Sequence, residues 1–133
     1  MEYAKELGDY FFAALAKNNK PGYKLPDKFD LNTAFRKAMQ REDFPEVVKK
    51  DIKTVEGRML TYFEIPDMIA QASRSGIIAP DISEGCFRIL VSPVIGRIIL
   101  EEIKDPDYLR GIEMLAEEAV KPENRGTMTY IGH

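Results

Sequence analysis

The stretch GCFRILVSPVIGRIIL, residues 85–100, is the most apolar part of the chain and limits its fold more than any other feature. A helix that crosses a membrane needs about 20 consecutive, mostly apolar residues. Here only eight residues separate Arg88 from Arg97, and a Ser-Pro pair and a glycine interrupt them. The stretch is therefore expected to be a buried core element or an interface rather than a membrane segment.

Two local signals divide this stretch into helical pieces. Residues 81–84, DISE, resemble a capping box, which predicts a helix over residues 82–91. The pair Ser92-Pro93 supplies an N-cap and a proline for the first turn, which predicts a second helix as far as Lys104. The segment FRILVS could equally form a buried strand, because periodicity does not distinguish helix from strand in a short apolar run. A helix that is apolar almost all round lies centrally in a fold or pairs with another chain.

Apolar residues at helical spacing predict further helices in the rest of the chain. They are expected over residues 2–18, 31–39, 44–65, 66–76 and 106–121, with residues 77–80 as a connector. Asp43, with Glu46 three residues on, would cap the third of these helices, and Gly76 would end the fourth. The sequence thus predicts a mainly α-helical bundle of five to seven helices. The alternative is an α+β fold whose small sheet pairs residues 58–65, 86–92 and 126–133 as strands.

The length of 133 residues favours a single domain. Residues 1–121 are predicted to form one helical domain, and residues 122–133 a tail, because the latter show no helical pattern. Within the domain, residues 19–29 hold three lysines, two prolines and a glycine. This lysine-rich loop is expected to be mobile and to be cut first by trypsin.

The composition is that of an ordinary soluble globular protein, with 44% hydrophobic and 31% charged residues. A formal net charge of −3 gives no general attraction to nucleic acid, so nucleic-acid binding is not expected. The single cysteine cannot form an internal disulfide, and the N-terminal region lacks the pattern of a signal peptide. These features predict a cytoplasmic protein without a membrane segment.

The residue sets that carry common chemistries are missing from the sequence. Cys86 has no internal histidine to act as its base, because the only histidine is His133, and it is expected to be a small buried hydrophobe. The usual metal sites need several His or Cys residues, and no glycine-rich phosphate-binding motif occurs. No catalytic residue, metal site or cofactor is therefore assigned, although the sequence leaves open whether the chain catalyses a reaction.

Two functions of different classes remain. The favoured one is a non-enzymatic interaction or assembly module (a subunit, adaptor or regulatory partner) that buries apolar helix surface against another chain, most simply a second copy. The residues expected at this interface are Val94, Ile95, Ile98 and Ile99. The alternative is a small helical ligand-binding protein or enzyme with an anion-binding pocket that uses Arg88 or Arg97. Arg74, in a polar Ser-Arg-Ser-Gly segment, is a further candidate for contacting the anion.

Overall fold

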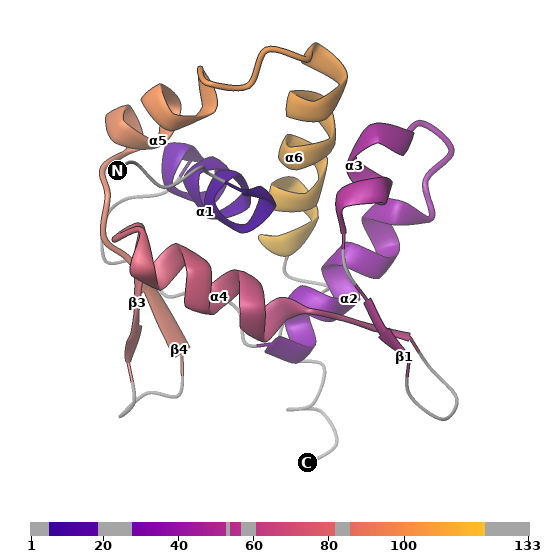
Figure 1. Ribbon diagram of the computed structural model, residues 1–133, viewed down its shortest axis with the longest axis horizontal. Helices are drawn as coiled ribbons and strands as arrows, with labels where there is room; N and C mark the ends of the chain where they lie inside the picture. Colours follow the sequence, from indigo (N-terminus) through magenta and orange to yellow (C-terminus); the bar gives the residue numbers. More distant parts are fainter. Residues whose placement is uncertain (1–5, 19–27, 53, 57–60, 82–85, 122–133) are drawn as a thin grey trace.

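The computed structural model describes residues 6–18, 28–52, 54–56, 61–81 and 86–121 (Figure 1). The helices in these ranges are α1 (Leu7–Asn18), α2 (Lys28–Met39), α3 (Glu46–Asp51), α4 (Ile65–Arg74), α5 (Pro93–Leu100) and α6 (Pro106–Ala119). The strands are β1 (Thr54–Glu56), β2 (Thr61–Phe63), β3 (Ile78–Asp81) and β4 (Cys86–Ile89). The prediction of a mainly α-helical fold is confirmed, and two small antiparallel hairpins accompany the helices. The predicted tail and most of the lysine-rich loop lie outside the described residues, and α2 already begins at Lys28.

The region between residues 44 and 65 is not the continuous helix that its periodicity predicts. Helix α3 has only six residues, and β1 and β2 follow it as an antiparallel hairpin with Val55 opposite Tyr62. β-Branched and aromatic residues favour a pleated strand when a neighbouring strand pairs with them. The alternative of a strand within residues 58–65 is therefore confirmed for residues 61–63.

A second hairpin replaces part of the helix predicted over residues 82–91. Strand β4 pairs with β3 in antiparallel register, with Ile78 opposite Ile89. Strand β3 occupies most of the segment that was expected to be a connector. The helix prediction was wrong because the pairing partner, which local periodicity cannot reveal, decides the structure of a short apolar run. Residues 82–85, which include most of the proposed capping box, lie outside the described residues.

The predicted starts of α5 and α6 are confirmed. The Oγ atom of Ser92 accepts a hydrogen bond from the backbone N–H three residues on, at 3.3 Å. The Oδ1 atom of Asp105 accepts one from the backbone N–H of Asp107, at 2.9 Å. A proline follows each cap and begins the helix, where its missing N–H costs no hydrogen bond. Helix α5 ends at Leu100 rather than at residue 104.

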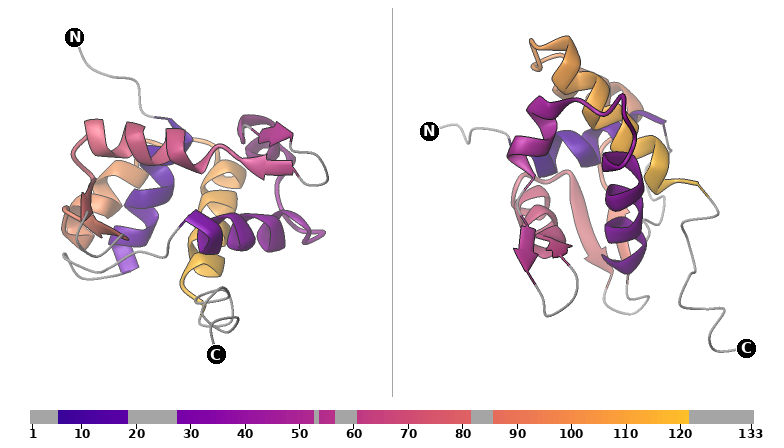
Figure 2. Two further views of the ribbon diagram at one scale, coloured as in Figure 1. Left: turned by 90° about the horizontal axis from the view of Figure 1, so that it is seen from below. Right: turned by 90° about the vertical axis from the view of Figure 1, so that its right-hand side faces the viewer.

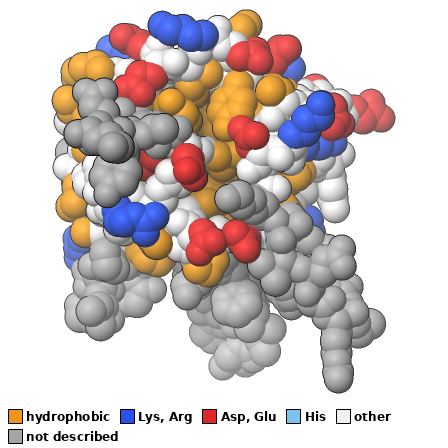
Figure 3. All heavy atoms as spheres, in the orientation of Figure 1, with side chains coloured by type: hydrophobic (Ala, Val, Ile, Leu, Met, Phe, Trp, Pro, Cys, Tyr) orange, Lys and Arg blue, Asp and Glu red, His pale blue; other side chains and the backbone are white. Residues whose placement is uncertain are grey.

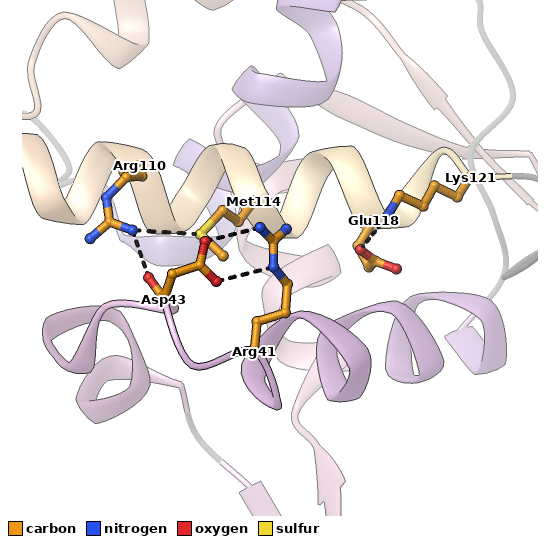
Figure 4. Close-up of polar contacts among 6 residues, drawn as sticks. All are labelled: Arg41, Asp43, Arg110, Met114, Glu118 and Lys121. Carbon is orange, nitrogen blue, oxygen red and sulfur yellow. Dashed lines mark hydrogen bonds and ion pairs between the residues drawn. The ribbon is translucent and has the colours of Figure 1, made fainter.

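Asp43 does not cap α3, contrary to the prediction from its spacing. The N-cap position is Pro45, and no side chain caps the helix. The carboxylate of Asp43 instead accepts two hydrogen bonds from the guanidinium of Arg41, at 3.1 and 3.0 Å. The backbone carbonyl of Asp43 accepts a third from Nη1 of Arg110, at 2.6 Å (Figure 4). Because Arg41 binds both oxygen atoms of the Asp43 carboxylate, this carboxylate does not cap α3. The bond from Arg110 links the turn between α2 and α3 to α6.

Gly76 ends α4 as the sequence predicts. Its φ of 78° lies in the left-handed region, where glycine avoids the steric cost of a Cβ atom. The N–H of Gly76 donates to the carbonyl of Ser73 at 3.1 Å, and the N–H of Ile77 donates to that of Ala72 at 3.0 Å. This pair of hydrogen bonds is a Schellman motif. The side chain of Ile77 is buried, and β3 begins at the next residue.

Helix α1 lies at the centre of the fold. Helices α4, α5 and α6 pack against it, α2 packs against α6, and the two hairpins lie at opposite ends of the molecule (Figures 1 and 2). The largest side chains with almost no exposure are Phe11, Phe12, Leu15, Leu31, Phe35, Val48, Ile77, Ile78, Ile89, Ile112 and Leu115. They come from helices and strands along most of the chain, so one core serves all the described elements. Within the described ranges, no helix is long and apolar enough to cross a membrane.

Candidate functional site

Helix α5 and the residue that ends the preceding hairpin carry a cluster of exposed apolar side chains. Five large hydrophobic side chains are exposed among the described residues, and four of them lie between residues 90 and 98. The exposed fractions are 55% for Leu90, 57% for Val94, 43% for Ile95 and 50% for Ile98. We call these four residues the α5 face. Contiguous exposed apolar surface of this kind marks interaction sites more often than scattered single residues do.

The seating of α5 on α1 turns the α5 face outward. A Cβ atom at Gly96 would lie 2.6 Å from the carbonyl oxygen of Ala13 and 2.9 Å from the backbone nitrogen of Lys17. The backbones of the two helices therefore approach more closely at Gly96 than any larger residue would allow. Ile99 is buried on the side of α5 that faces the core. With about 3.6 residues per turn, Val94, Ile95 and Ile98 then point away from α1.

Three of the four predicted interface residues belong to the α5 face. Ile99 is only 8% exposed and is buried within its own chain, so its side chain is not available on this surface. The sequence could not distinguish the buried Ile99 from its exposed neighbours, because the stretch is apolar on all sides. Leu90 was not among the four predicted interface residues, because the sequence placed it in a separate helix over residues 82–91. Its backbone N–H donates to the carbonyl of Ile77 at 2.8 Å, which fixes Leu90 at the end of the β3–β4 hairpin.

The three candidate anion-binding arginines are not gathered around one pocket. Arg97 is exposed on α5, and Arg88 is half-buried in β4, opposite Ala79. Neither of them lines the larger or the smaller of the two pockets described for this fold. Arg74, at the end of α4, lines the larger pocket. The geometry therefore offers no joint role for Arg74, Arg88 and Arg97.

The larger pocket has a volume of about 630 Å³ and lies between α1, α3, α4 and α6. We call it the acidic pocket, because four carboxylates line it: Glu6, Asp51, Glu64 and Asp67. Arg74 is the one cationic side chain among the lining residues that the structure describes. Figure 3 shows acidic side chains beside a stretch of apolar surface on the face of the molecule that α4 crosses. The excess of carboxylates makes this pocket unfavourable for an anion.

A buried carboxylate lies behind one wall of the acidic pocket. Asp9 is 1% exposed, and its neighbours in α1 line the pocket. Its Oδ2 atom accepts hydrogen bonds from the backbone N–H of Glu6 at 3.1 Å and from Nε2 of Gln71 at 3.2 Å. The bond from Glu6 is one of the two hydrogen bonds of a capping box at the start of α1, in which a side chain of the first turn accepts from the N–H of the N-cap residue. The Oδ1 atom has no hydrogen-bond partner within the described part of the chain.

Two tyrosine rings form another part of the wall. Tyr10 of α1 and Tyr108 of α6 meet edge to face, with ring centroids 6.5 Å apart and planes at 82°. Burial raises the pKa of the Tyr108 phenol above its ordinary value of 10.0. A hydrogen bond to Asp51 and the negative charge of that carboxylate raise this pKa further. Tyr108 is therefore held neutral, next to a carboxylate, at the edge of the acidic pocket.

We expect Tyr108 to ionise in the folded chain only at a pH well above 10. Its contribution to stability is fully present below the unfolded-state pKa of 10.0 and is lost as the pH rises toward the higher folded-state pKa. The difference in tyrosinate absorbance between the wild type and Tyr108→Phe should show a late ionisation, and the substitution should flatten the loss of stability above pH 10. A difference spectrum with an ordinary midpoint near 10 in the folded chain would contradict the assignment.

The acidic pocket could not be predicted from the sequence, because its charged and aromatic residues come from separate elements and share no local spacing. Among the described positions, no group of three or more His, Cys, Asp or Glu residues could hold a metal ion. The α5 face, in contrast, lies within one short stretch and was largely visible in the sequence. No protein-family model matches this chain, and comparisons with curated proteins and with solved structures found no match either.

Proposed function

We propose that this chain is a protein-interaction module whose α5 face docks on a partner, and that this partner is a second copy of the chain. The observation that carries the proposal is the concentration of exposed large hydrophobic side chains between residues 90 and 98, namely Leu90, Val94, Ile95 and Ile98. A closed two-fold dimer is the commonest way in which such a surface is covered. We place the protein in the cytoplasm, a reducing compartment that suits a chain with one cysteine.

Charged side chains flank the α5 face. Arg97 and Glu101 are both exposed, four residues apart on α5 and its C-cap. An apolar patch with a polar, solvent-accessible rim is the usual arrangement of a protein interface.

The expected dimer is weak. Burying the remaining exposed half of eight aliphatic side chains, four from each copy, contributes roughly 6–12 kcal/mol. Association costs about 4–15 kcal/mol of translational, rotational and side-chain freedom. At the favourable end of both ranges the net gain is about 8 kcal/mol, which corresponds to a dissociation constant on the order of micromolar, and this is the tightest dimer expected. Self-association should therefore be sought at high protein concentration.

The anion-binding alternative has no comparable support. Arg88 and Arg97 lie outside both described pockets, and the larger pocket carries four carboxylates against one guanidinium. We therefore propose neither an anion site nor a reaction for this chain.

The substitution Ile98→Glu tests the proposed interface. Ile98 is half-exposed, so a glutamate there can remain in water and the variant should keep the helical circular dichroism and melting temperature of the wild type. It should also reduce self-association at least about tenfold, because dimerisation would desolvate the new charge. The measurement is light scattering coupled to size exclusion over a series of protein concentrations.

Two control variants make this result specific. Val47→Glu places the same charge at an exposed hydrophobic residue outside the α5 face, and it should leave self-association unchanged. Ile99→Glu buries the charge next to Ile98 in sequence, and it should destabilise the fold by several kcal/mol. Equal loss of association in the Val47 and Ile98 variants would contradict docking through the α5 face.

A further inference from the structure

We draw no further inference here: the strongest candidate, the acidic pocket between α1, α3, α4 and α6, is a cluster of acidic side chains, and no second feature of the described residues points to a ligand there, since the buried Asp9 is not among the residues that line it.

Discussion

Phe11→Ala is expected to lower the free energy of unfolding by about 3–5 kcal/mol, the range found for removing a buried aromatic ring. Phe11 has no exposed surface and lies on α1, the central helix of the fold. Its ring meets those of Phe12 and Phe35 edge to face, each with centroids 4.9 Å apart. The substitution therefore removes hydrophobic burial and two aromatic contacts, and it leaves a cavity that α1 and α2 cannot easily close.

Urea denaturation followed by circular dichroism measures this effect. Val47→Ala, at an exposed position on α3, is the control and should change the unfolding free energy by no more than about 0.5 kcal/mol. A loss below about 1 kcal/mol for Phe11→Ala would show that Phe11 is not in the centre of a close-packed core.

Gly96→Ala is expected to destabilise the chain by about 1–3 kcal/mol, although alanine is the better helix former. Helix propensity alone would favour the alanine by about 1 kcal/mol. The added Cβ atom, however, would lie 2.6 Å from the carbonyl oxygen of Ala13 and 2.9 Å from the backbone nitrogen of Lys17. Both are backbone atoms of α1 and cannot rotate away, so the two helices must separate. The steric cost should therefore exceed the gain in propensity.

The matched control for this variant is Arg97→Ala, at the exposed neighbour of Gly96 on the same helix. At dilute protein, where the proposed dimer should be dissociated, it should change the unfolding free energy by no more than about 0.5 kcal/mol. If Gly96→Ala were as stable as the wild type or more stable, the close seating of α5 on α1 would be incorrect. The outward direction of the α5 face would then lose its structural basis.

Local sequence signals predicted the parts of the fold that depend on neighbours in the chain. Ser92 and Gly76 define helix ends through bonds that span only a few residues, and both are found as expected. Asp105 caps the helix predicted from residue 106 in the same local way. The hairpins depend on pairing between strands, so the periodicity of residues 44–65 and 82–91 was misleading. Asp43 is an exception among the local signals, because Arg41, two residues earlier, binds its carboxylate with two hydrogen bonds.

The two candidate sites differ in how much of each the sequence could reveal. The α5 face lies within one stretch, and the structure was needed only to exclude the buried Ile99 and to add Leu90. The acidic pocket brings together Tyr108 of α6, Asp51 of α3 and Asp67 of α4, which are far apart in sequence. Each of these residues alone resembles an ordinary surface residue, so no local pattern pointed to the pocket.

The mass of the wild-type chain as a function of concentration tests the docking of the α5 face most directly. Sedimentation equilibrium should give 15.2 kDa in dilute solution. As the concentration rises through the micromolar to millimolar range, the mass should approach about 30 kDa, that of a dimer. A mass of 15.2 kDa at every concentration, for a folded chain, would contradict the proposal that a second copy covers the α5 face.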